Sequence, residues 1–407
     1  MFMKHRRENI LVYIKTHSVV SVDVLAELFS VSSRTIRNDL AYLASFGLIK
    51  RMYGGAAFVH HALLTQLSRD DKNEISQIIR NVKHTCATQE NKTPSGKVCI
   101  LGTFFVDIIT KVDHLPTLGE ELLLASDISF GPGGKGANQA LAASAAGAMV
   151  HFVAKVGSDQ FGHMAHDHLV SSGISSFTLY QTSEASTGCS IIYVSQEHGE
   201  SIIAISPGAN KKITEHEISA MYHELSEANV FLLHTGNNIN AVISAIKLAN
   251  FLNIMVILNP APITEEIKPC LPMVNIIIPN IIAASRLSGI EVQDVESAKA
   301  AAKVIHSLGV KTVIITMGGF GALLYIDSSF YHFPAYSSVQ IDTTGAGDAF
   351  SGAFSAMMAK GENILYCVNY ASAFASLVVE KEGAANMPNV EEINYRLKRK
   401  VSRYELV

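Results

Sequence analysis

The segment IDTTGAGDAFSGAF, residues 341–354, joins a glycine-rich turn to a carboxylate. The pattern predicts a turn through Gly345, Ala346 and Gly347 that opens a helix whose first side chain is Asp348. Backbone N–H groups and the positive end of a helix both attract anions, so we expect an anion hole with the carboxylate of Asp348 beside it. The alternative is that Asp348 only caps the helix.

A second glycine-rich segment, GPGGKGANQALAASAAGA at residues 131–148, leads into an alanine-rich helix. Glycines allow a backbone to approach a ligand closely, and the side chains of Lys135 and Asn138 can reach polar groups there. Taken alone, the segment is also typical of a tight turn before a packed helix.

Apolar runs of strand length alternate with helical patterns from residue 97 onward. The predicted strands are 98–102, 150–156, 190–194, 230–234, 254–258, 275–278 and 312–316, and the helices include 137–146, 240–251 and 295–308. This alternation is typical of an α/β fold with a largely parallel sheet, helices on both faces and ligands at the carboxyl ends of the strands. Residues 121–130 and 188–206 predict extra strands of a small β lid.

Residues 1–56 form a basic head, with eight basic and four acidic side chains in a chain of net charge −4. An anionic partner is expected for this head alone. Three short helices are predicted, over 7–15, over 22–29 with Ser21 as N-cap, and from Ser32 or Ser33 to about Ser45.

The third of these helices offers side chains of the types that bind phosphates and base edges. They are Arg34, Thr35, Arg37 and Asn38. A strand and turn over 48–56 would follow as a wing that carries Lys50, Arg51 and Tyr53.

The composition predicts two or three folded domains, because 407 residues with 48% hydrophobic side chains are too many for one ordinary core. The longest apolar runs, 252–258 and 274–279, are shorter than the roughly 18 residues that span a bilayer, and no signal-peptide pattern follows MFMKHRREN. We therefore expect a cytoplasmic protein. Five widely spaced cysteines predict reduced thiols, mostly in the core. The polar residues 57–96 predict a linker.

The segment RRENILVYIKTHSVVSVDVLAELFSVSSRTIRNDLAYLASFGLIKRMYGGA resembles the N-terminal winged helix-turn-helix of DeoR-family transcriptional regulators. The resemblance implies a DNA-binding domain over 1–56 that binds duplex DNA through Arg34, Thr35, Arg37, Asn38 and Arg51. Operators are usually read by dimers, so we expect a homodimer. The sugar-phosphate-sensing domain that usually follows this head is not recognisable here.

The two glycine-rich segments together resemble the PfkB family of carbohydrate kinases, and GGKGANQA is the version typical of ribokinases. The likeness covers residues 97–396 and includes LGTFFVDII, STG at 186–188, PGAN at 207–210, LNPAP at 258–262, TMGGFG at 316–321 and KEGAANMP at 381–388. It implies a ribokinase-like fold with a small β lid and the transfer of phosphate from ATP to a sugar.

The PfkB resemblance also implies roles for individual residues. Asp348 corresponds to the general base, which takes the proton of the sugar's primary hydroxyl as its oxygen attacks the γ-phosphate. The amides of Gly345, Ala346 and Gly347 would stabilise the phosphoryl group in transfer, and Mg²⁺ would bridge the phosphates. The other matches are sugar-contacting positions (Asp107, Gly134, Lys135, Gly136, Asn138), nucleotide-contacting positions (Asn280, Thr316, Gly318, Gly319, Gly321, Gly347, Ser372) and ligands of an activating monovalent cation, usually K⁺ (Asp342, Thr344, Gly383).

Three positions depart from the family pattern. Phe105 stands where ribokinases carry a sugar-binding Asn, unless Phe105 points into the core and Phe104 or Thr103 faces the pocket. Thr235, Gly236 and Asn237 stand where a sugar-binding Glu is usual. The family's N-x-x-E reads Asn280, Ile281, Ile282, Ala283, without the Glu that organises the metal.

Two functions of different class follow. One is an ATP-dependent kinase of ribose or a related pentose, such as 2-deoxyribose, with a fused DNA-binding regulatory domain. The other is a transcriptional regulator whose kinase-like body mainly senses a sugar or nucleotide. The intact GAGD motif favours the kinase, and Ala283 favours the sensor.

Overall fold

The computed structural model describes residues 6–7, 10–11, 13–14, 19–29, 31–45, 49–52, 55–58, 96–120, 122–197, 200–399 and 405–406. The chain divides into two compact units, one formed by residues up to 93 and one formed by nearly all the residues after it. Each unit has its own core.

The N-terminal unit combines helices with a small antiparallel sheet whose strand order is β1-β3-β2. Its strands are β1 Val19–Ser21, β2 Ile49–Met52 and β3 Gly55–Phe58, and its helices are α2 Val22–Leu28 and α3 Ser33–Ser45. The predicted cap is confirmed, since Ser21 Oγ accepts from the N–H of Val24 at 3.2 Å. Of the helix expected over 7–15, only part lies in the described residues.

The predicted linker begins too early, because Ala57 and Phe58 belong to β3 and pair with β2. Because the sequence after residue 58 is polar, it gave no indication that the wing has a second strand. Residues 59–95, which make up most of the predicted linker, lie outside the described residues.

Asp39 is a buried carboxylate at the centre of the N-terminal unit. It accepts hydrogen bonds from Arg6 Nε at 2.7 Å and from Arg7 Nε at 2.8 Å, and the guanidinium of Arg7 also lies 3.8 Å from the centre of the Tyr42 ring. A buried carboxylate needs such partners, because an unpaired charge away from water is costly. Two of the basic side chains of the head are therefore used inside the fold.

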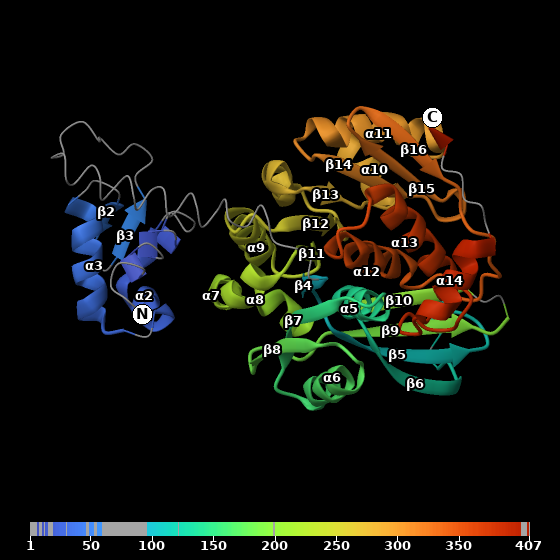
Figure 1. The fold of residues 1–407 in the computed structure, drawn as a ribbon. Helices are drawn as coiled ribbons and strands as arrows, with labels where there is room; N and C mark the ends of the chain where they lie inside the picture. The colour runs from blue at the N-terminus through green and yellow to red at the C-terminus, as the bar shows by residue number, and fades with distance from the viewer. Residues whose placement is uncertain are drawn as a thin grey trace. The chain divides into compact units, whose positions relative to one another are not determined.

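The C-terminal unit is built on a ten-stranded sheet of order β17-β16-β15-β14-β13-β12-β11-β4-β7-β8 (Figure 1). The strands from β14 to β8 run parallel, and β15, β16 and β17 continue the sheet antiparallel. Their bounds are β4 Lys97–Leu101, β7 Met149–Gly157, β8 Ser176–Thr182, β11 Val230–His234, β12 Met255–Asn259, β13 Ile276–Ile277, β14 Thr312–Thr316, β15 Ala322–Ile326, β16 Ser329–Phe333 and β17 Glu405–Leu406.

Both faces of this sheet are buried. Along β11, Val230 and Leu232 belong to a core shared with helices on one face, while Phe231 and Leu233 are buried on the other. Alternate side chains of a strand point to opposite faces, so helices must cover both. The helices are α5 Lys135–Ala145, α6 Gln160–Ser171, α7 Glu215–Ala220, α8 Tyr222–Glu227, α9 Ile239–Phe251, α10 Ile281–Ser288, α11 Val295–Ser307, α12 Ala346–Ala359, α13 Ile364–Val378 and α14 Val390–Arg399.

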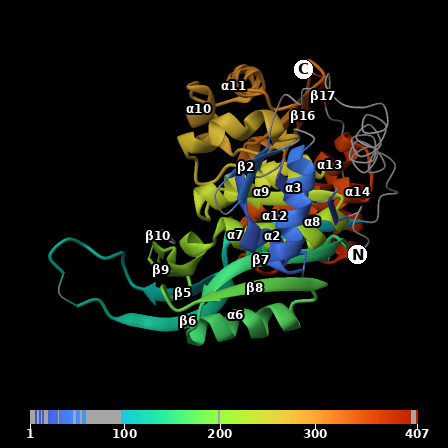
Figure 2. The same ribbon diagram turned by 90° about the vertical axis from the view of Figure 1, so that its left-hand side faces the viewer.

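A separate four-stranded sheet of order β10-β9-β5-β6 forms the expected lid. Figure 2 shows its strands projecting to one side of the main sheet. The strands are β5 Phe105–Val112, β6 Ala125–Gly133, β9 Cys189–Ser195 and β10 Ser201–Ser206. The strand expected over 121–130 starts later and ends later than predicted.

Cys99, Cys270 and Cys367 are buried free thiols and Cys189 is a partly exposed one, as expected, while Cys86 lies outside the described residues. Within the described part of the chain, no helix is both long enough and apolar enough to cross a membrane.

Candidate functional site

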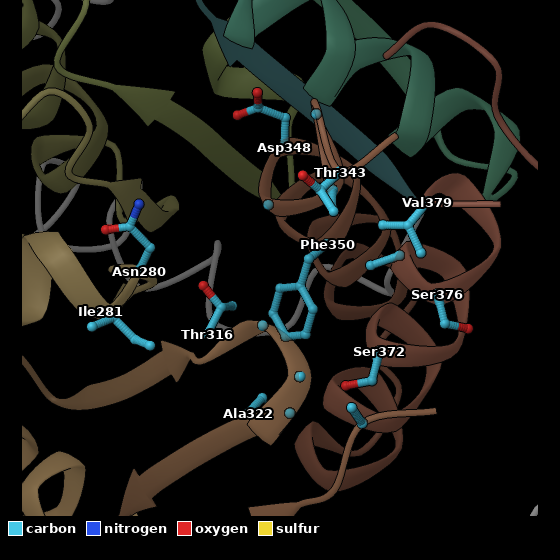
Figure 3. A pocket seen from close by; sticks show the side chains of 18 of the residues that line it. Asn280, Ile281, Thr316, Ala322, Thr343, Asp348, Phe350, Ser372, Ser376 and Val379 are labelled. Carbon is cyan, nitrogen blue, oxygen red and sulfur yellow. The ribbon is translucent and has the colours of Figure 1, made fainter. Parts of the chain in front are cut away.

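A cavity of about 890 Å³ lies in the C-terminal unit between the strand ends and helices α12 and α13. Figure 3 shows Asn280, Ile281 and Thr316 on one side of it and Ser372 and Ser376 on the other, with Asp348 away from both at the far end. This volume is within the range of pockets that hold ligands the size of a nucleotide.

Asp348 lies in the first turn of α12, where the helix dipole is positive. Gly345, in the left-handed region at φ 77°, is the N-cap, so the helix begins at Ala346, two residues earlier than predicted. Gly345 is required there, because a Cβ would lie 2.6 Å from Cβ of Ala384. Asp348 does not act as a cap, and its carboxylate instead contacts α5.

Two side chains of α5 hold this carboxylate, which is 5% exposed. Gln139 Nε2 donates to Oδ1 of Asp348 at 3.1 Å, and Lys135 Nζ lies 3.7 Å from Oδ2. Burial raises the pKa of Asp348, while the charge of Lys135 and the hydrogen bond from Gln139 oppose that rise. A carboxyl with a raised pKa next to a helix N-terminus is suited to proton transfer beside a negatively charged group.

The first turn of α5 is packed tightly against the main sheet. Helix α5 starts at Lys135 and not at Ala137, because Gly134 with φ 101° turns the chain into the helix. A Cβ on Gly136 would lie 2.3 Å from Cα of Gly102, so Gly136 allows the helix to touch the end of β4. Asn138 is buried, and its Oδ1 has no partner among the described residues.

Asp107 comes from the lid. It lies opposite Ser190 in the β5–β9 pair, and Ser190 Oγ donates to its Oδ1. Burial raises the pKa of Asp107, and the bond from Ser190 lowers it. Gly133 leaves room for this carboxylate, because a Cβ there would lie 2.0 Å from Oδ2.

The residues matched to the nucleotide lie together in the cavity wall. An isolated parallel bridge pairs Asn280 with Thr316, which places the ends of β13 and β14 side by side. Gly318, with φ 55°, and Gly321, with φ 89°, form the turn after β14. Gly319, Gly347 and Ser372 also line the cavity.

Asp342, Thr344 and Gly383 also lie together. Asp342 Oδ1 accepts from the N–H of Thr344 at 2.8 Å, and Oδ2 accepts from the N–H of Gly383 at 3.0 Å. The carboxylate thus ties the loop before α12 to the loop after α13. Among the described residues, no cluster of three or more His, Cys, Asp or Glu side chains is placed to hold a metal ion.

Phe105 is half-buried and does not point into the core. Its ring lies between two glycines, since a Cβ on Gly134 or on Gly188 would come 3.0 or 3.1 Å from it. Phe104 is the core residue, at 1% exposure, and Thr103 is buried too. Phe105 is therefore the aromatic residue beside the turn that starts α5.

Two residues of the site were missed from the sequence. Gln139 stands in the quoted GGKGANQA motif one helical turn after Lys135, and this i, i+4 spacing was the signal that both reach one partner. His234, buried at the end of β11, receives the N–H of Thr103 at Nε2 at 3.1 Å. No sequence pattern indicates that contact across 131 residues.

In the N-terminal unit, Arg34, Arg37, Asn38 and Arg51 are exposed, as a nucleic-acid contact requires. Thr35 is half-buried, its Oγ1 is 2.9 Å from Ser32 Oγ, and its N–H donates to that oxygen. Thr35 therefore helps to start α3, and its side chain is less available for a contact with DNA than those of Arg34, Arg37 and Asn38.

Comparisons with known proteins match both units. Residues 95–391 match the model of the pfkB family carbohydrate kinases, and residues 6–62 match the DeoR-like helix-turn-helix domain. The chain is 34% identical over 302 residues to a ribokinase of Staphylococcus aureus, covering 74% of this chain and 99% of the relative. It is 31% identical over 299 residues to a deoxyribokinase of Salmonella typhi, covering 73% of this chain and 97% of that relative. The structure of Arabidopsis thaliana ribokinase complexed with ribose and ATP superposes with a TM-score of 0.68 at 28% identity, covering 74% of this chain and 98% of that one.

The environment of Asp348 predicts a stability that depends on pH. Its pKa in the folded protein is raised, so the folded state binds this proton more tightly than the unfolded chain, and ionisation of Asp348 costs stability as pH rises through that pKa. Asp348→Asn should therefore unfold at a higher temperature than the wild type at neutral pH, with a difference that shrinks toward pH 4. Calorimetry across this range measures it, with Asp127→Asn at an exposed lid position as control. A variant less stable than the wild type at every pH would contradict this account.

Proposed function

We infer that this chain, which belongs to the pfkB family of carbohydrate kinases, is an ATP-dependent kinase of ribokinase type with a fused DNA-binding regulatory domain. The proposed acceptor is ribose or a related pentose such as 2-deoxyribose, phosphorylated at its 5-hydroxyl. The single observation that carries the proposal is the buried carboxylate of Asp348 at the end of a nucleotide-sized cavity, beside the N-terminus of α12.

In the proposed reaction, Asp348 takes the proton of the primary hydroxyl while that oxygen attacks the γ-phosphorus of ATP. The bond from the γ-phosphorus to the β–γ bridging oxygen breaks, and ADP leaves with the electron pair. The amides of Gly345, Ala346 and Gly347 would stabilise the charge that develops on the phosphoryl oxygens, although the N–H of Ala346 donates to the backbone oxygen of Thr343 at 3.3 Å in this structure. Lys135, whose Nζ lies 3.7 Å from Oδ2 of Asp348, opposes the rise in the pKa of Asp348 and so favours the ionised base.

Among the described residues that line the cavity, only Asp348 carries a carboxylate. Because Asp348 is assigned to the base and is paired with Lys135, Mg²⁺ would be held mainly by the nucleotide phosphates and water. When bound with ATP, Mg²⁺ would neutralise phosphate charge. Asp342, Thr344 and Gly383 would hold a monovalent cation such as K⁺, since each carboxylate oxygen of Asp342 accepts one backbone N–H and keeps a further lone pair for a cation.

The remaining residues would position the two substrates. We assign the sugar to Asp107, Gly134, Lys135, Gly136 and Asn138. We assign the nucleotide to the cavity wall formed by Asn280, Thr316, Gly318, Gly319, Gly321, Gly347 and Ser372. The free Oδ1 of Asn138 supports the first assignment, because a buried polar atom without a partner in the protein is suited to a ligand.

A regulator that only senses its ligand is the second candidate, and Ala283 favours it. Ala283 is buried and its N–H donates to Asn280 Oδ1 at 2.8 Å, so that position offers no carboxylate to a metal. In this reading the C-terminal unit would bind a sugar or nucleotide without transferring phosphate.

Replacing the base separates the two candidates. Asp348→Asn keeps the size of the side chain but removes the proton acceptor, so kcat should fall roughly 10²- to 10⁴-fold while nucleotide binding persists. A coupled assay of ADP formation over a panel of pentoses and ketohexoses, with Mg²⁺ and K⁺, measures kcat, and calorimetry measures binding. If the wild-type protein phosphorylates no sugar at all, the kinase is excluded and the regulator that only senses its ligand is the function that remains.

The apolar ring of Phe105 beside Gly134 predicts a weak preference for ribose over 2-deoxyribose, or the reverse preference. An apolar wall cannot hydrogen-bond a hydroxyl, whereas an Asn could. Phe105→Asn should raise kcat/KM for ribose relative to 2-deoxyribose by about tenfold, in line with one hydrogen bond to a substrate hydroxyl. Phe104→Leu in the core is the control. An unchanged ratio would show that Phe105 does not set specificity.

We propose that the protein is a homodimer through its lid. The lid strands expose apolar side chains that a monomer would normally cover. They are Ile128, Phe130, Ile191, Ile202, Ile203 and Ile205. A dimer also matches the two half-sites that helix-turn-helix proteins usually read.

The exposed basic side chains predict specific duplex DNA binding that weakens steeply with salt. Arg37→Ala should lower affinity for an operator selected from a random library by roughly 10- to 100-fold, because a base contact is worth about 1–3 kcal/mol. Arg51→Ala should weaken binding to all sequences more evenly. Gel shift measures affinity and the number of chains per duplex, with the exposed Arg286→Ala in the other unit as control. Binding that survives deletion of residues 1–56 would refute the assignment.

A further inference from the structure

The segment between β16 and α12 lines the cavity without regular structure of its own. Residues 334–340 form neither helix nor strand, and Ser337, Val339 and Gln340 are exposed. Tyr336 is buried, so apolar burial fixes the segment there and leaves the residues after it to polar contacts. The residues of the segment that line the cavity are Ala335, Tyr336, Ser337, Ser338 and Gln340.

Polar contacts to this segment come from Arg396 in α14 and from Glu380, which follows α13. Arg396 Nη1 donates to the backbone oxygen of Ser337 at 3.1 Å, and Glu380 Oε1 accepts from the N–H of Val339 at 3.3 Å. Arg396 Nη2 also donates to Glu380 Oε2 at 2.7 Å, so the two charged groups act as one unit. The side chain of Arg396 is 17% exposed and that of Glu380 is 28% exposed, and an ion pair buried to this degree is screened less than a surface pair.

The contacts fall on alternate residues of the chain. The ion pair binds the backbone of Ser337 and Val339, and the N–H of Ile341 donates to the backbone oxygen of the C-cap residue of α13 at 2.8 Å. Ser338 and Gln340 lie between these residues and line the cavity. The segment is therefore held from the side of α13 and α14, and the residues between the contacts remain available to a ligand.

Arg396 also supports the wall of the cavity that α13 forms. Its Nη1 donates to Ser376 Oγ at 3.1 Å, and Ser376 lines the cavity beside Ser372 (Figure 3). The hydroxyl of Ser376 in turn donates to the backbone oxygen of Ala373 at 2.7 Å, so its proton is used within α13 and the oxygen accepts from the arginine. One guanidinium therefore connects the segment 334–340 with α13.

Helix α14 has other contacts that keep it in place. Ile393 is fully buried in the main core, and Leu397 packs against that core. Lys381 Nζ donates to Glu392 Oε2 at 3.3 Å, which ties the first turn of α14 to the loop after α13. Arg396 also lies beyond residue 391, where the match to the pfkB model ends. We therefore expect a variant at Arg396 to fold with α14 docked.

We propose that Arg396, paired with Glu380, is a positioning residue for the nucleotide, because it holds the segment 334–340 and Ser376 in the arrangement that binds it. The proposal rests on the nucleotide site of the proposed function. Arg396 does not itself line the cavity, so it acts through Ser337 and Ser376. Without it, the segment would have to be ordered when the nucleotide binds, and that ordering costs binding free energy.

The test measures nucleotide and sugar affinity separately in the full-length protein. Arg396→Met removes the charge and its hydrogen bonds but keeps an apolar stem. The Kd of a non-hydrolysable ATP analogue, from calorimetry, and the KM for ATP, from ADP formation, should both rise roughly 5- to 50-fold, while the KM for the pentose changes less than about threefold. Arg396→Lys should recover part of the affinity, because an ammonium can still pair with Glu380. Lys398→Met, at an exposed position of the same helix, should behave as the wild type.

A second variant tests whether the two charged residues act together. Glu380→Met should also weaken binding of the ATP analogue. Because Arg396 and Glu380 act through one contact, the double variant should lose little more affinity than the weaker-binding single variant. Losses that simply add would show that the two residues do not act as a unit, which overturns the proposal.

The outcomes separate this inference from the kinase itself. If the wild type phosphorylates a pentose and Arg396→Met binds the ATP analogue equally well, the inference is overturned and the kinase remains. If the wild type binds the analogue, Arg396→Met loses that affinity and no phosphate is transferred, the inference is supported and the kinase is refuted. Equal losses of affinity for the nucleotide and the pentose would show that Arg396 serves only the fold, which also overturns the inference.

Discussion

The burial of one negative charge, that of Asp348, constrains the arrangement of the C-terminal unit. A carboxylate removed from water needs compensation, and here it comes from the N-terminus of α12 and from Lys135 and Gln139 on α5. Helices α5 and α12 must therefore pack closely, and glycines make this possible. A Cβ on Gly352 of α12 would lie 2.3 Å from the backbone oxygen of Gln139. The geometry of the base and the packing of the core are thus one constraint.

The rest of the site is arranged around that carboxylate by long-range contacts. The lid supplies Asp107, and the strand ends supply Asn280 and Thr316. Each comes from an element whose own reason to fold is apolar burial, and each adds one polar group at an end or an edge. In the proposed kinase, a substitution at a position such as Phe105 would therefore change substrate choice while Asp348 stays in place.

Local pattern was enough to predict much of this fold. Strands 230–234 and 312–316 occur as predicted, because residues buried on both faces give unbroken apolar runs of Val, Ile and Leu. Helix starts were less accurate, since Gly134 and Gly345 act through positive φ angles that their identity permits but does not require. The second strand of the wing was missed, because GAAF has little strand character without its partner β2. Contacts such as Gln139 with Asp348, or Arg6 and Arg7 with Asp39, join distant parts of the chain, and one sequence does not show them.

The central claim is that Asp348 acts as a base whose pKa is raised by burial and held down by Lys135. The dependence of kcat/KM on pH, measured for the wild type and for Lys135→Met, tests it most directly. The account predicts that activity falls on the acid side as Asp348 takes up a proton, and that Lys135→Met moves this fall to higher pH because the opposing positive charge is lost. An acid limb that stays in place, or that moves to lower pH in Lys135→Met, would contradict it.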